Sequence, residues 1–146
     1  IILSPGPGYP CAAGICEDTV RRFQGKIPIL GVCLGHQGIC EVCGAEIRRA
    51  PRIMHGKKSR IRLSGNCPLF QGLGTELEAA RYHSLVAARE TVPAELLVTA
   101  TDEDGEVMAV QHKDYPVFGL QFHPESILTP LGDHIMKNFL AMGKGV

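Results

Sequence analysis

The segment around Cys33 has the residue types and the spacing of a nucleophilic site. Cys33 follows a short apolar run and has Gly31 two residues before it and Gly35 two residues after it. This pattern is typical of a sharp turn between a buried strand and a helix, where a side chain at either glycine would press on the neighbouring element. A helix N-terminus stabilises a thiolate, so we predict a lowered pKa for Cys33. The amide N–H of Leu34 is expected to face a developing oxyanion. The alternative is that Cys33 is only a small buried residue.

A nucleophilic thiol needs a group that takes and returns its proton. Among the six histidines, His123 stands just after the apolar run 117–121, and open α/β sheets place their ligand sites at the C-terminal ends of strands. Pro124 fixes the turn that brings Glu125 beside the imidazole, where a carboxylate can hold one ring nitrogen and leave the other for the thiol. We therefore predict a triad of Cys33, His123 and Glu125. The α/β-hydrolases place the acid before the histidine, so a cysteine hydrolase of unrelated substrates is a weaker hypothesis.

Alternating strands and helices must position these side chains. The pattern predicts strands at 1–3 and 27–32 and helices at 16–23 and 34–43, with the first strand buried and followed by a rigid proline- and glycine-rich loop. The second half predicts strands at 46–50, 57–63, 76–81, 96–101, 107–112 and 117–121, a hairpin at Asp104-Gly105 and a helix at 131–142. We expect an α/β fold: an open, mostly parallel sheet flanked by helices in three layers, with additional antiparallel strands.

Composition narrows the classes of function. The chain has 146 residues, 45% of them hydrophobic, which suits one domain, and its 15 basic residues balance 15 acidic ones, which argues against nucleic acid as the main ligand. The apolar runs fall far short of the roughly 18–20 residues that span a bilayer, so we expect neither membrane insertion nor secretion. Six cysteines in a chain this rich in aliphatic residues indicate a reducing, cytoplasmic setting rather than a disulfide framework. Cys40-x-x-Cys43 has no second pair, so no metal site is predicted.

Four separated blocks carry a resemblance to a known family. They are Leu3-Ser4-Pro5-Gly6-Pro7-Gly8, Gly31-Val32-Cys33-Leu34-Gly35-His36-Gln37, Arg81-Tyr82-His83-Ser84-Leu85 and the run from Gln121 to Thr129. With them, essentially the whole chain resembles the class I, triad-type glutamine amidotransferase domain. Within that family it is similar to the branch that serves chorismate-using synthases. That domain opens with a further β-α-β stretch, so residues 1–146 are expected to form the domain without this segment.

The resemblance implies a role for each matching residue. Cys33 would attack the side-chain amide of L-glutamine, His123 would protonate the departing ammonia, and Glu125 would orient His123. The remaining positions would bind glutamine or the oxyanion: Gly6, Pro7, Gly8, Leu34, Gln37, Ser84 and Leu85. His36 and His83 are expected to be packing or supporting residues.

The same resemblance implies a partner protein, and it implies no cofactor in this domain. Ammonia would pass to a separate chorismate-binding synthase subunit in a hetero-oligomer, for anthranilate or, alternatively, for aminodeoxychorismate. A docking subunit without glutaminase activity is a further alternative. The run 47–63 holds seven basic residues and no acidic one, and it is either a docking face for that partner or a solvated hairpin.

Overall fold

The computed structural model describes residues 1–64 and 66–143. The described elements are β1 (Ile2–Leu3), α1 (Cys16–Phe23), β2 (Ile29–Val32), α2 (Leu34–Val42), β3 (Ile47–Leu63), β4 (Glu76–Ala87), β5 (Leu96–Thr101), β6 (Val107–His112), β7 (Val117–Leu120) and α3 (Gly132–Met142), with short 3₁₀ turns at Pro10–Ala12, Pro68–Phe70 and Arg89–Thr91. The predicted helices and most of the predicted strands are present with boundaries within one or two residues, but the strand predicted at 76–81 extends to Ala87 and two other predicted strands are joined. No helix among the described residues is long and apolar enough to span a bilayer.

The strands form one mixed sheet in the order β1-β2-β7-β6-β5-β3-β4. β1, β2 and β7 are parallel neighbours, whereas the pairings from β7 through β4 are antiparallel. The α/β class with additional antiparallel strands is thus confirmed. The antiparallel share of the described sheet is larger than the sequence indicated, because hairpins rather than helices connect most of the second half.

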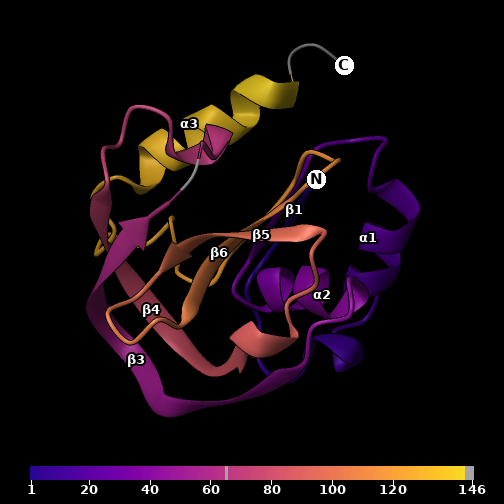
Figure 1. The fold of residues 1–146 in the computed structure, drawn as a ribbon, viewed down its shortest axis with the longest axis horizontal. Coiled ribbons are helices and arrows are strands. Elements are labelled where there is room, and N and C mark those ends of the chain that lie inside the picture. The colour runs from indigo at the N-terminus through magenta and orange to yellow at the C-terminus, as the bar shows by residue number, and fades with distance from the viewer. Residues whose placement is uncertain (65, 144–146) are drawn as a thin grey trace.

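Helices cover both faces of this sheet, as the three-layer prediction requires (Figure 1). Neighbouring residues of β2 point to opposite faces: Ile29 packs in one buried cluster with Val20 of α1 and Ile39 of α2. Leu30 packs in the other cluster, which includes Ile135 and Phe139 of α3. β2 and β7 are therefore buried on both sides and form a rigid base for the loops at their C-terminal ends.

The prediction of a wholly buried first strand is wrong. Leu3 is buried, but Ile1 and Ile2 are 36% and 46% exposed because β1 lies at the end of the strand order and pairs only with β2. Its backbone still pairs in register, with Ile2 opposite Leu30 and Leu3 opposite Gly31. The strand therefore delivers the following loop to the C-terminal end of β2.

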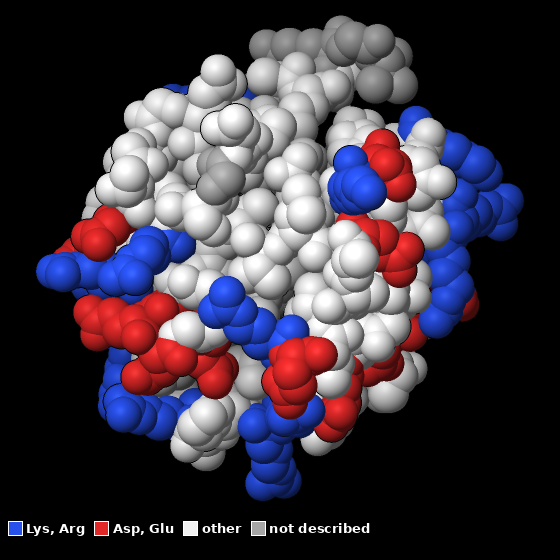
Figure 2. All heavy atoms as spheres, in the orientation of Figure 1, with Lys and Arg blue, Asp and Glu red and all other residues white. Residues whose placement is uncertain are grey.

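The two strands predicted at 46–50 and 57–63 are one continuous strand of 17 residues, β3, paired with the 12-residue β4. Two register shifts, at Arg49/Met54 and His55/Lys57, allow the strand to continue through Pro51 and Gly56. Acidic residues neutralise part of the basic run: Arg48 pairs with Glu46 and Glu90, Lys58 with Glu78, and Arg60 with Glu76. Figure 2 shows acidic groups beside basic ones over this side of the molecule.

Candidate active site

Cys33 occupies a strained turn between β2 and α2. Its φ of 54° and ψ of −101° make it the one non-glycine residue with positive φ in residues 1–64 and 66–143. A Cβ on Gly31 would overlap the backbone of Gly35 and lie 2.7 Å from the amide nitrogen of His36. A Cβ on Gly35 would overlap the carbonyl oxygen of Leu3 and lie 2.7 Å from its Cβ. The two glycines thus have the steric role predicted for them, and Cys33 is the N-cap of α2.

Strand register brings His123 to the same edge of the sheet as Cys33. Val32 lies opposite Leu120 in the parallel β2–β7 pair, and the amide of Cys33 donates to the carbonyl of Leu120 at 2.7 Å. His123 follows β7 by three residues, and its own amide donates to the carbonyl of Ala80 at 3.0 Å. Both residues therefore stand at the carboxyl ends of adjacent strands, where the sequence placed the site.

The imidazole of His123 has one engaged and one free nitrogen. Nδ1 lies 2.6 Å from Oε1 of Glu125, whose side chain is about half exposed. Nε2 is buried and has no hydrogen-bond partner among the described residues. The Tyr82 ring stands edge-on to the imidazole, with centroids 5.0 Å apart, and the backbone carbonyl of Tyr82 accepts from the Cys33 thiol at 3.8 Å. Cys33 and His123 therefore share Tyr82 as a neighbour, with a free ring nitrogen available to a reacting group.

The turn that carries His123 is anchored on both sides. The hydroxyl of Thr129 donates to the carbonyl of His123 at 2.7 Å and accepts from the amide of Ala80 at 2.9 Å. A Cβ on Gly132, the first residue of α3, would overlap the carbonyl oxygen of Pro124. This close packing fixes the backbone that presents the imidazole.

The prediction of a lowered Cys33 pKa is wrong for the structure as it stands. Burial raises the pKa of Cys33 to about 11 because desolvation penalises the thiolate. Within that value, the amide N–H of Leu34 lowers the pKa as the helix argument anticipated, and the negative charge of Glu125 makes a smaller upward contribution. Burial outweighs the helix terminus, so at neutral pH the sulfur is a thiol that needs a base at the moment of attack.

The alkylation of Cys33 is expected to show this protonation state. Below the pKa, the thiolate fraction rises about tenfold with each pH unit, so the rate of reaction with iodoacetamide should climb between pH 7 and pH 10 without levelling. Peptide mass spectrometry resolves Cys33 from the other cysteines, and free cysteine in the same tube levels off above a pH of about 8.5. A plateau of the Cys33 rate at or below that pH would contradict the assignment.

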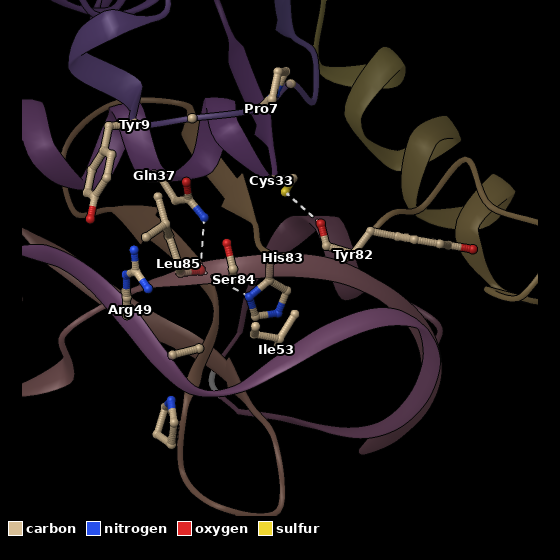
Figure 3. Close-up of a pocket in the computed structure, with 14 residues that line it drawn as sticks. Pro7, Tyr9, Cys33, Gln37, Arg49, Ile53, Tyr82, His83, Ser84 and Leu85 are labelled. Atoms are coloured by element: carbon tan, nitrogen blue, oxygen red, sulfur yellow. Dashed lines mark hydrogen bonds between the residues drawn. The ribbon is translucent and has the colours of Figure 1, made fainter.

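A cavity of about 580 Å³ opens above the Cys33 sulfur. Among its walls are seven of the residues predicted to bind or attack substrate: Gly6, Pro7, Gly8, Cys33, Gln37, Ser84 and Leu85. Figure 3 shows Gln37, Ser84 and Leu85 grouped on one side of the cavity and Cys33 on another. Leu34, His123 and Glu125 do not line it. Leu34 is nonetheless adjacent to Gly6, since a Cβ on Gly6 would lie 3.0 Å from its Cδ2.

Three residues of this site did not emerge from the sequence. Gln121 is fully buried; its Nε2 lies 3.7 Å from the Cys33 sulfur and its Oε1 accepts from Nε2 of Gln37 at 3.2 Å. The sequence signal for Gln121 was a glutamine at the end of an apolar strand. Arg49 lines the cavity from β3, and Tyr82 lines it from β4. Arg49 was counted only with the basic run, because the bulge that turns it toward the cavity is not visible in the sequence.

Comparison with known proteins identifies the family of this chain. Residues 1–142 match the family model "Glutamine amidotransferase class-I". The chain is 54% identical over 96% of its length to the bifunctional protein TrpGD of Thermotoga maritima, of which it spans 24%. It is 49% identical, again over 96%, to the aminodeoxychorismate/anthranilate synthase component 2 of Bacillus subtilis, of which it spans 72%.

A solved structure extends the likeness to three dimensions. A protein of Thermoplasma acidophilum assigned to GMP synthase superposes with a TM-score of 0.88 at 26% identity, over 99% of this chain and 72% of that one. The chain that contains the strained turn at Cys33, the neighbouring His123 and the cavity thus belongs to the class I glutamine amidotransferase family.

Proposed function

We propose that this chain hydrolyses L-glutamine to glutamate and ammonia through a thioester on Cys33 and delivers the ammonia to a chorismate-using synthase subunit. The observation that carries the proposal is the cavity with a strained cysteine at its base, next to a histidine whose Nε2 is free and whose Nδ1 is held by a carboxylate. Membership in the amidotransferase family supports the same chemistry.

In the first half of the reaction, the Cys33 sulfur attacks the carbon of the glutamine side-chain amide. The thiol proton passes to Nε2 of His123, and the carbonyl oxygen becomes an oxyanion that the amides of Leu34 and Gly6 stabilise. Collapse of this intermediate breaks the carbon–nitrogen bond. The leaving nitrogen takes the proton from His123 and departs as ammonia, leaving a glutamyl thioester.

In the second half, water attacks the thioester and gives a proton to His123. The carbon–sulfur bond then breaks, the sulfur recovers the proton, and glutamate leaves. Glu125 keeps Nδ1 of His123 protonated and stabilises the imidazolium that forms in each half. The glutamine head group would be held by Gln37 and by the main chain at Ser84 and Leu85, with Pro7 and Gly8 closing the cavity on the opposite side. All steps use side chains, main-chain amides and water, so the proposed reaction requires no cofactor in this domain.

We propose that this ammonia is used to make anthranilate. Aminodeoxychorismate is the second candidate product. The Bacillus subtilis relative is named for both activities, and the choice lies with the partner subunit that binds chorismate. Part of the basic run on β3 would contact this partner, because Arg49, Arg52, Lys57 and Arg62 form none of the ion pairs found among the described residues.

Isotope transfer tests the proposal directly. The full chain is mixed with a chorismate-binding synthase subunit from the same genome, chorismate and glutamine labelled with ¹⁵N at the amide. We expect labelled anthranilate or aminodeoxychorismate, together with glutamate. Ammonia supplied in place of glutamine separates the outcomes: product with ammonia but none with glutamine would contradict the proposed glutaminase activity and would favour the docking alternative.

A further inference from the structure

A buried ion pair lies behind the glutamine cavity, on the β3–β4 side. Nη1 of Arg81 lies 2.8 Å from Oδ2 of Asp102, with both side chains less than a tenth exposed, and 3.2 Å from the hydroxyl of Ser59. The amides of Asp104 and Glu106 donate to the other oxygen of Asp102. A charged pair held by this many partners is fixed in position rather than free to rotate.

Another donor of this guanidinium, Nε, is directed toward the site. Nε of Arg81 donates to Nε2 of His83 at 3.0 Å, so Nε2 must be the unprotonated nitrogen of that ring. Nδ1 then carries the hydrogen, and it donates to the carbonyl of Leu85 at 3.0 Å. Burial, with a smaller contribution from the charge of Arg81, lowers the pKa of His83 to about 4. At neutral pH, His83 is therefore a neutral ring in one tautomer.

The carbonyl of Leu85 joins this arrangement to the residues of the cavity. It also accepts from Nε2 of Gln37 at 3.0 Å, as Figure 3 shows. Gln37 in turn donates to Gln121, which reaches the sulfur of Cys33. Arg81, His83 and Leu85 alternate along β4, so all three side chains lie on its buried face.

We propose that Arg81, held by Asp102, is a positioning residue for glutamine binding: it fixes the tautomer of His83, which orients the Leu85 carbonyl and through it the side chain of Gln37. This inference rests on the proposed function for its substrate, whereas the His83 tautomer is a property of the protein alone. Arg81 neither contacts the sulfur nor lines the cavity itself; it acts through the ring of His83, which does line it.

Arg81→Lys is the sharpest variant because it retains the charge that Asp102 requires. A lysine ammonium lacks the planar fork that lets arginine bind Asp102 and His83 at once. We expect the KM for glutamine to rise by roughly ten- to a hundredfold with kcat little changed, since the loss falls on placement of the substrate. Arg60→Lys is the matched control: Arg60 lies on the neighbouring strand in an exposed pair with Glu76 and has no link to His83.

Two further readouts separate this proposal from a structural role and from the proposed function. In ¹⁵N-histidine NMR of the unsubstituted chain, His83 should carry its hydrogen on Nδ1, and this signature should be lost or mixed in Arg81→Lys. Iodoacetamide should still alkylate Cys33 at the rate of the parent chain. An Nε2–H tautomer in the parent, or an unchanged KM in the variant, would overturn the inference. If the parent chain does not hydrolyse glutamine, the proposed function fails, and the NMR result alone decides the tautomer.

Discussion

Cys33→Ala is expected to lower glutamine-dependent product formation on the order of 10⁴-fold or more, while formation from ammonia stays within about twofold of the parent complex. The reason is that Cys33 is the one cysteine among the described residues that line the cavity: a methyl group at residue 33 leaves the cavity and the partner contact in place but removes the nucleophile. The two rates are measured on the same complex with saturating chorismate, with glutamine or ammonium as the nitrogen donor.

Cys43→Ala provides the matched control for this substitution. Cys43 is the C-cap of the same helix, is partly buried and lies outside the cavity. Its replacement should leave both rates unchanged. Loss of the ammonia-dependent rate in Cys33→Ala would point to a damaged complex instead, and retention of the glutamine-dependent rate would exclude Cys33 as the nucleophile.

The largest expected effect on stability comes from Gly31→Ala. The added methyl group would meet the backbone of Gly35 and His36, which no side-chain rotation can relieve. We expect the free energy of unfolding to fall by more than about 3 kcal/mol, or the chain not to fold, because the strand and the helix would have to separate. Urea denaturation followed by circular dichroism measures the difference.

Gly38→Ala, seven residues further on in α2, tests whether the effect comes from steric contact rather than from glycine itself. A Cβ there would lie 3.7 Å from Pro10 and 3.9 Å from Glu17, which is ordinary contact. Alanine favours a helix interior over glycine by roughly 0.5–1 kcal/mol, so this variant should be more stable than the parent. Equal losses in the free energy of unfolding from both substitutions would refute the steric explanation of the turn at Cys33.

Local patterns predicted the parts of the site that depend on local structure. The spacing of Gly31, Cys33 and Gly35 is a property of one turn, and His123 with Glu125 is a property of another. The apolar runs that precede each turn were enough to place both at strand ends. The three-layer arrangement followed from the order of strands and helices in the same way, although the antiparallel share of the sheet was underestimated.

Properties that depend on distant parts of the chain could not be predicted in this way. The pKa of Cys33 is set chiefly by the burial of its sulfur, and this burial cannot be inferred from the residues next to it in the sequence. The contact of Arg81 with Asp102 joins β4 to the turn after β5, and it requires a known register between strands. The bulges of β3, which bring Arg49 to the cavity, depend on its pairing with β4.

The overlap that a Cβ at Gly132 would make with the Pro124 carbonyl has a consequence for mutational tolerance. In a library of random variants selected for growth that depends on formation of the reaction product, we expect residue 132 to tolerate as few replacements as residue 33. This is expected although residue 132 lies at the start of a helix and outside the cavity. Selection would thus mark as indispensable a position whose whole contribution is the absence of a side chain.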